Sequence, residues 1–315
     1  MAVRIAVIGV GHLGRHHARI LASLPHVELV GVVDTNRARA DEVARTVGTQ
    51  VVAHPSDLVG RVDAVSVAVP TARHDDIARP WLDRGVHVLV EKPLARTLDE
   101  ADALIAAASR AGATLAVGHT ERFNPAVTTA RPLVRDPRFI EGHRLGTFPD
   151  RSLDIDVVFD LMIHDLDVVL SLVPADVDSI EAVGVPVLTD RVDIANVRLR
   201  FRNGCIANLT ASRNSRDRVR KIRFFQRAAY LSIDYAAQRV EAWRLTQGAG
   251  AMPAIEGGEV PVASIEPLRC ELEDFVAAIR ERRDPLVTGS QGRRALALAQ
   301  QIADRMDQAS ALPKP

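Results

Sequence analysis

Three polar residues of this 315-residue sequence have the types and settings needed for acid-base chemistry. Lys92 follows an apolar run that ends at Val90, and Pro93 after it favours an extended backbone that fixes where the ammonium points. Asp160 precedes His164 by one helical turn in "FDLMIHDLDVVL", so its carboxylate can orient the imidazole. The sequence therefore offers a cation, a base and a group that orients the base.

These groups fit the oxidation of an alcohol. The hydroxyl must meet a base and a positive hydrogen-bond donor while the carbon loses a hydride. An imidazole with an ordinary pKa of ~6.5 accepts a proton near neutrality, whereas a lysine at ~10.4 must first be desolvated. We therefore expect His164 to be the base, Lys92 to hold the alkoxide and Asp160 to orient His164. Taken alone, each has a structural interpretation, a solvated strand-end charge or a surface ion pair.

A glycine motif supplies the expected hydride acceptor. Gly9, Gly11 and Gly14 have G-x-G-x-x-G spacing directly after an apolar strand and at the start of a helix, which favours a dinucleotide pyrophosphate. Asp34 lies 34 − 14 = 20 residues past the last glycine, where a carboxylate can bind ribose hydroxyls and repel a 2′-phosphate. This predicts NAD over NADP, a preference that Arg37 weakens. The alternative is a structural glycine turn with a surface aspartate.

The elements that must position these residues form two predicted domains. Residues 1–120 alternate near-continuous apolar strands with helices, the pattern of a Rossmann-type doubly wound parallel sheet. The helix that starts at Thr97 shows a capping-box pair with Glu100. Residues 121–315 contain a helix near 157–173 and several alternating strands, which predicts an α+β domain with a large, mostly antiparallel open sheet.

Composition excludes several classes of protein. Forty Lys and Arg residues balance forty Asp and Glu residues, which argues against binding to nucleic acid or to an anionic membrane. Two cysteines without metal-type spacing indicate neither a disulfide framework nor a metal site. No signal-peptide pattern and no apolar run of ~20 residues are present, so we expect a cytoplasmic protein. His12, His16 and His17 are expected to be solvated or on a helix side, without a catalytic role.

The motifs "VPTARH", "VEKP" and "DLMIHDLD", together with the glycine motif, resemble those of the Gfo/Idh/MocA family of NAD(P)-dependent oxidoreductases over essentially the whole chain. The resemblance implies that Lys92 and His164 act at the substrate carbon. It also implies a last helix that returns to the first domain, and pairing through the open sheet into a homodimer or homotetramer. The implied cofactor-binding residues are Gly9, Gly11, His12, Leu13, Gly14, Asp34, Pro70, Thr71, His74, Glu91 and Lys92.

Within that family, "VGHTERFNPAV" and the histidine helix are similar to bacterial UDP-N-acetylglucosamine 3-dehydrogenases. That similarity implies oxidation of the sugar 3-hydroxyl, followed by a partner aminotransferase in the synthesis of lipid A. It makes Glu121, Arg122, Asn124 and Asp160 candidate substrate contacts, although "ERFNP" can equally be an interdomain ion pair and turn. The segment "RSLDIDVVFD" departs from the glycine-rich lead of many relatives. The alternatives are a dehydrogenase of another sugar, inositol or cyclic substrate, and a non-catalytic cofactor-sensing regulator.

Overall fold

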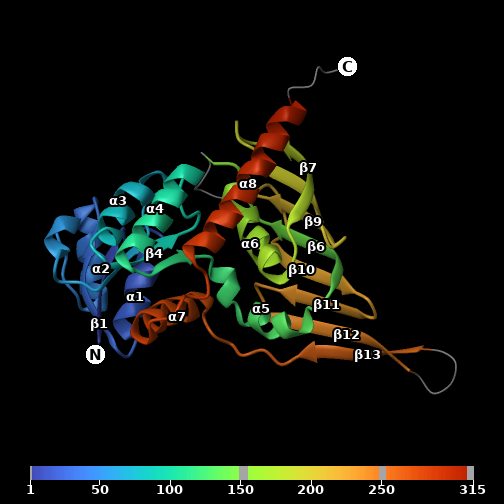
Figure 1. The fold of residues 1–315 in the computed structure, drawn as a ribbon, viewed down its shortest axis with the longest axis horizontal. Coiled ribbons are helices and arrows are strands. Elements are labelled where there is room, and N and C mark those ends of the chain that lie inside the picture. The colour runs from blue at the N-terminus through green and yellow to red at the C-terminus, as the bar shows by residue number, and fades with distance from the viewer. Residues whose placement is uncertain (1, 149–154, 248–252, 311–315) are drawn as a thin grey trace. The chain divides into compact units, whose positions relative to one another are not determined.

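The computed structural model describes residues 2–148, 155–247 and 253–310, which fall into two compact units (Figure 1). The first unit comprises Met1–Thr120 and Glu266–Arg294, and the second comprises Glu121–Ile265 and Ala295–Pro315. The segment 266–294 thus belongs to the first unit although it follows the whole sheet-forming region of the second. The first four residues of the departure segment "RSLDIDVVFD", 151–154, lie outside the described residues.

The first unit contains a five-stranded parallel sheet with strand order β2-β1-β3-β4-β5. Its strands are largely buried because helices cover both faces, as the continuous apolar runs predict. The strands are β1 (Val3–Ile8), β2 (Val27–Val33), β3 (Ala64–Val67), β4 (His87–Glu91) and β5 (Leu115–Gly118). The predicted doubly wound parallel sheet is confirmed.

Five helices belong to this unit, within the part of the chain that the structure describes. They are α1 (Gly14–Ser23), α2 (Arg37–Val47), α3 (His74–Leu82), α4 (Leu98–Ala111) and α7 (Pro267–Glu281). Helix α1 packs on α2 and α7, and α3 packs on α4. Thr97 caps α4 by accepting a hydrogen bond from the Glu100 amide at 3.2 Å. The Glu100 carboxylate accepts a hydrogen bond from the Arg96 amide, whereas in a capping box it would accept from the amide of Thr97.

The second unit contains an eight-stranded sheet with strand order β13-β12-β11-β10-β6-β9-β8-β7. Every pairing is antiparallel except that of β6 with β9, so the predicted mostly antiparallel sheet is confirmed. The strands are β6 (Pro137–Leu145), β7 (Val177–Val185), β8 (Ile194–Phe201), β9 (Ile206–Ser212), β10 (Val219–Gln226), β11 (Ala229–Asp234), β12 (Arg239–Gln247) and β13 (Pro253–Val260).

One face of this sheet forms the core of the second unit. Buried side chains alternate along the strands and pack on helices α5 (Pro125–Ala130) and α6 (Ile163–Leu172), and on the later part of α8 (Gly289–Ser310). A π-helical turn, Val158–Met162, leads directly into α6. Within the described ranges, no helix combines the length and apolar character that crossing a membrane requires.

Candidate active site

The loop after β1 has the geometry of a dinucleotide-binding turn. Gly9 has a φ of +87°, and a Cβ there would lie 2.6 Å from the Ala68 carbonyl oxygen. A Cβ on Gly14 would overlap the Gly9 carbonyl oxygen, so only glycine allows this approach of helix to strand. A Cβ on Gly11 would meet nothing within 4 Å. Gly9 and Gly14 therefore build the turn, and the backbone at Gly11 is open to a pyrophosphate.

The rest of this loop suits an anion. His12 and Leu13 connect the open glycine to α1, and Leu13 is exposed. Helix α1 carries no acidic residue in its first turn, so none of its own side chains neutralises the positive end of the helix dipole. The predicted cofactor loop thus fits the phosphates of NAD.

Asp34 lies just after β2 and is held beside this loop. Its carboxylate accepts hydrogen bonds from the amides of Val10 and Asn36, each at 2.8 Å, and from the Arg39 guanidinium at 2.7 and 3.2 Å. Burial opposes ionisation of Asp34, but the hydrogen bonds from Arg39, Asn36 and Val10 outweigh it and lower the pKa of Asp34. The cation beside Asp34 is therefore Arg39, whereas Arg37 pairs with Asp41 at 3.1 Å.

The ends of β3 and β4 carry the next group of predicted residues. Pro70 precedes a short 3-10 helix, Thr71–Arg73, and α3 begins at His74. The buried His74 ring contacts the Val69 carbonyl oxygen through Nε2 and the Pro93 carbonyl oxygen through Nδ1, both at 2.9 Å. Burial lowers the pKa of His74, which the two carbonyl groups partly offset. His74 thereby joins the loop after β3 to the backbone that follows Lys92.

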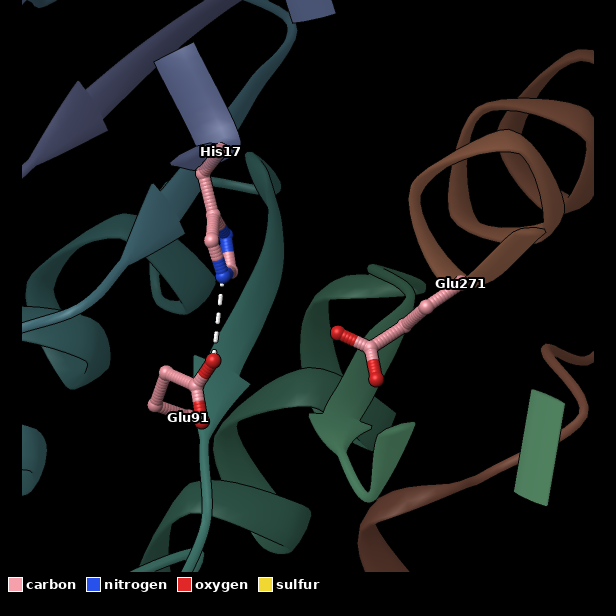
Figure 2. Close-up of side chains that lie close together, drawn as sticks. All are labelled: His17, Glu91 and Glu271. Atoms are coloured by element: carbon pink, nitrogen blue, oxygen red, sulfur yellow. Dashed lines mark hydrogen bonds and ion pairs between the residues drawn. The ribbon is translucent and has the colours of Figure 1, made fainter. Parts of the chain in front are cut away.

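Glu91, the last residue of β4, is engaged on both carboxylate oxygens. Oε1 lies 3.0 Å from Nε2 of His17, and Oε2 accepts a hydrogen bond from the Lys92 amide at 3.1 Å. His17 is buried and its Nδ1 lies 2.8 Å from the Ser66 hydroxyl (Figure 2 shows His17 and Glu91). Of the two expectations for His17, solvated or on a helix side, the structure excludes the first and shows His17 on the buried side of α1. The sequence could have indicated that His17 is buried, because it falls on the apolar stripe of α1 with Ala18 and Leu21.

Asp160 and His164 lie where the π-helical turn meets α6, and both are half-buried. The apolar residues of this segment form a buried stripe; its members are Met162, Leu166, Val169 and Val173. Asp167, which the helical period assigns to the stripe of Asp160 and His164, is instead buried and paired with Arg122 at 3.4 Å. Asp160 lies in the π-helical turn, whose i→i+5 spacing shifts it relative to the faces of α6.

Two buried ion pairs, Arg144 with Asp165 and Arg122 with Asp167, hold α6 within the second unit. Asp165 receives two hydrogen bonds from Arg144, at 2.8 and 3.0 Å, and Arg144 also contacts Glu121 at 3.0 Å. Burial disfavours the charge on Arg144, but Asp165 and Glu121 outweigh it and raise its pKa. Arg144 also lies over the Tyr235 ring, 5.0 Å from its centroid. This network holds the backbone that carries His164.

The predicted substrate contacts 121, 122 and 124 take part in contacts within the second unit. Asn124 caps α5 through the Ala126 amide and donates to the carbonyl oxygen of Tyr235 and the carboxylate of Glu121. Arg122 is buried against Asp167, as noted. These contacts favour a structural role for all three residues, and contact with substrate stays a prediction. Lys92 belongs to the first unit and His164 to the second, so their convergence on one oxygen also stays a prediction.

Comparison with known proteins identifies the relatives of both units. Residues 3–119 match the model described as oxidoreductase family, NAD-binding Rossmann fold, and residues 127–232 match the GFO/IDH/MocA C-terminal domain. The chain is also 41% identical to the UDP-N-acetylglucosamine 3-dehydrogenase of Acidithiobacillus ferrooxidans, over 95% of this chain and 96% of that protein. The chain belongs to the Gfo/Idh/MocA family. It is an oxidoreductase whose cofactor is NAD, as the glycine motif and Asp34 predict.

Solved structures and a second relative place the chain within this family. The crystallised enzyme from Acidithiobacillus ferrooxidans superposes with a TM-score of 0.91 at 39% identity, covering 98% of this chain and 99% of that one. The scyllo-inositol 2-dehydrogenase (NAD(+)) of Bacillus subtilis is 30% identical over 68% of each chain. A levoglucosan dehydrogenase in complex with NADH and levoglucosan shares the fold, with a TM-score of 0.88 at 19% identity, over 98% of each chain.

Proposed function

We propose that this dehydrogenase oxidises the 3-hydroxyl of UDP-N-acetylglucosamine to the 3-keto nucleotide sugar. The observation that carries the proposal is the 41% identity, over nearly the full length of both chains, to an enzyme of that name. The identity covers 95% of this chain, so it extends through both units. The fold alone would not support this substrate, because one scaffold serves many.

The proposed reaction assigns one task to each residue. His164 takes the proton of the 3-hydroxyl, Asp160 stabilises the imidazolium that results, and Lys92 donates a hydrogen bond to the developing alkoxide. NAD, when bound, accepts the hydride from the same carbon. Gly11 and the start of α1 would bind the pyrophosphate, and Asp34 would bind the adenosine ribose. The alcohol thus loses one proton to His164 and one hydride to the cofactor.

The substrate is tested by NADH formation. With NAD and UDP-N-acetylglucosamine we expect NADH absorbance, which should increase when an aminotransferase and an amino donor remove the ketone. Scyllo-inositol, myo-inositol and free N-acetylglucosamine are the comparison substrates. Turnover of an inositol with none of the nucleotide sugar would favour the alternative dehydrogenase. Tight NAD binding without turnover of any substrate would favour the cofactor-sensing regulator.

The proposed product requires a second enzyme that uses it as a substrate. A 3-keto nucleotide sugar is a substrate for transamination, so we propose a functional aminotransferase partner and a place in the synthesis of the 3-amino sugar of lipid A. This follows from the chemistry of the ketone and from the resemblance to the 3-dehydrogenases. Mass spectrometry of the coupled reaction should detect the 3-amino nucleotide sugar. Accumulation of ketone without amine, with an active aminotransferase, would exclude this partner.

The outer face of the second sheet supports a homo-oligomer as part of the proposal. Leu245 in β12 lies opposite Ile255 in β13, and these side chains are 50% and 72% exposed. Trp243, on the same face as Leu245, continues the apolar surface towards Tyr230 in β11. Exposed apolar surface of this kind on a broad sheet is typical of contacts between subunits.

We expect the double substitution Leu245→Asp and Ile255→Asp to shift the protein from a dimer or tetramer to a monomer. Charged side chains on the sheet face would have to be desolvated in the interface, which costs several kcal/mol. Light scattering coupled to size-exclusion chromatography measures the mass. Val59→Asp, which changes an equally exposed apolar residue of the first unit, is the control. An unchanged mass for the double variant would place the subunit contact elsewhere.

A further inference from the structure

A buried carboxyl group of the first unit has no task in the proposed chemistry. Glu271 lies on α7 and is 1% exposed, and among the described residues the only group near hydrogen-bonding geometry with its carboxyl group is the Thr120 hydroxyl. Figure 2 shows its carboxyl group directed towards the hydrogen-bonded pair of His17 and Glu91. One polar atom from each of the three side chains lies within 4.8 Å of the others. The three residues come from α7, α1 and β4 and form a buried cluster.

Two members of this cluster, His17 and Glu91, are hydrogen-bonded to each other. His17 uses both ring nitrogens, Nδ1 towards Ser66 and Nε2 towards Glu91, so its orientation is fixed. Burial opposes ionisation of Glu91, but the His17 contact and the nearby charge of Lys92 outweigh it and lower the pKa of Glu91. Glu91 therefore carries the negative charge of the cluster. A second ionised carboxylate this close would be strongly repelled, because the site is buried.

The surroundings of Glu271 favour the protonated form of its carboxyl group. Burial is the largest cause that raises the pKa of Glu271 well above its ordinary value, and the charge on Glu91 adds to it. A hydrogen bond from the Thr120 hydroxyl acts in the opposite direction, and Asp274, on the same helix, adds a smaller effect that raises the pKa. The facing groups are thus two acids, one hydroxyl and the histidine bound to Glu91. No cation among these groups compensates an ionised Glu271 directly.

Glu91 connects this cluster to the proposed chemistry. Its Oε2 accepts the hydrogen bond of the Lys92 amide, which fixes the backbone from which the Lys92 side chain projects. Its carboxyl group also occupies the space beside Gly118, where a Cβ would lie 3.1 Å from the Glu91 Cδ. Glu91 thus has little room to move, and a repulsive charge on Glu271 would act directly on the contacts that hold Lys92.

We propose that Glu271 is a positioning residue, held as a neutral carboxylic acid so that Glu91 alone is charged, keeps its bonds to His17 and to the Lys92 amide, and thereby sets the direction of Lys92. The proposal rests on the proposed role of Lys92 at the alkoxide. A metal ion held by the same three residues would require Nε2 of His17 to give up its hydrogen bond to Glu91, so the observed pair favours a proton in this cluster.

The first test is the pH dependence of stability in Glu271→Gln. In the folded wild type, Glu271 keeps a proton that the same residue of the unfolded chain releases above its ordinary pKa of ~4.3. The wild type therefore loses stability as the pH rises from that value towards the raised pKa of the folded state. The amide cannot ionise and avoids this loss. We expect the Tm of the variant to exceed that of the wild type by about 3 °C or more at pH 8, with the difference shrinking towards pH 5.

The matched control is Glu273→Gln, which changes an exposed acid on the same helix that pairs with Arg269. Its Tm difference from the wild type should not change between pH 5 and pH 8. Infrared spectroscopy gives a direct check, because the carbonyl absorption of a protonated carboxylic acid should be present in the wild type and absent from Glu271→Gln. A variant destabilised equally at every pH, with no acid carbonyl band in the wild type, would show that Glu271 is ionised and overturn the proposal.

The second test separates positioning from stability. In the wild type, kcat should decline at alkaline pH as Glu271 ionises, and Glu271→Gln should move that decline to higher pH while KM for NAD stays the same. An alkaline decline identical in both proteins would overturn the positioning role. One equivalent of tightly bound metal in the purified protein would overturn the neutral acid. If no substrate is turned over, stability and infrared spectra still decide the state of Glu271, independently of the proposed function.

Discussion

Replacing either Lys92 or His164 with alanine is expected to lower kcat by on the order of a hundredfold or more, while NAD still binds. Lys92→Ala removes the donor that stabilises the developing alkoxide. His164→Ala removes the base, and solvent replaces it poorly in a site held for one substrate orientation. Pre-steady-state measurement of NADH formation isolates the chemical step, and fluorescence titration reports the binding of NAD.

The second lysine of the described chain provides the matched control. Lys221 pairs with Asp234 at 3.2 Å on the second sheet and is given no role in the reaction. Lys221→Ala should therefore keep the kcat of the wild type. Lys92→Arg tests geometry, because it keeps the charge but changes the position of the donors, and we expect it to recover only part of the rate. Normal turnover by Lys92→Ala or by His164→Ala would remove that residue from the mechanism.

Replacing Asp34 with serine is expected to reduce the preference for NAD over NADP by on the order of a hundredfold. The carboxylate accepts two backbone amides and the Arg39 guanidinium, so in the wild type the negative charge is fixed where a 2′-phosphate would lie. Serine removes the repulsion and leaves Arg39 able to pair with the phosphate. A change of 1.4 kcal/mol corresponds to a factor of ten, so about 3 kcal/mol is required of the two effects together.

The separate effects of repulsion and pairing can be measured with two further variants. Adding Arg39→Ala to Asp34→Ser should abolish most of the gain with NADP, because the cation that binds the phosphate is lost. Arg37→Ala is the control, since Arg37 pairs with Asp41 and not with Asp34. The ratio of kcat/KM for the two cofactors is the readout. Equal use of NADP by the single and double variants would show that Arg39 takes no part in cofactor choice.

Local sequence was sufficient for the cofactor loop and for both fold classes. The spacing of Gly9, Gly11 and Gly14 predicts a turn because the requirement for glycine acts within a few residues, and the structure shows that a Cβ would clash at Gly9 and Gly14. The alternation of apolar residues similarly separates a parallel sheet covered on both faces from a sheet covered on one. The sequence did not indicate that Arg39 is the partner of Asp34, because Arg37 is closer to Asp34 along the chain and carries the same charge.

Tertiary structure alone decided which polar groups meet in the interior. Residues 17, 91 and 271 are far apart in the chain, and nothing local indicates that α7 brings Glu271 to the end of β4. Asp165 and Asp167 are both buried, because Arg144 and Arg122 reach them from other elements and offset the cost of desolvation. Sequence periodicity reports which faces are apolar. The burial of a charge depends on a partner, and only the folded chain supplies the partner.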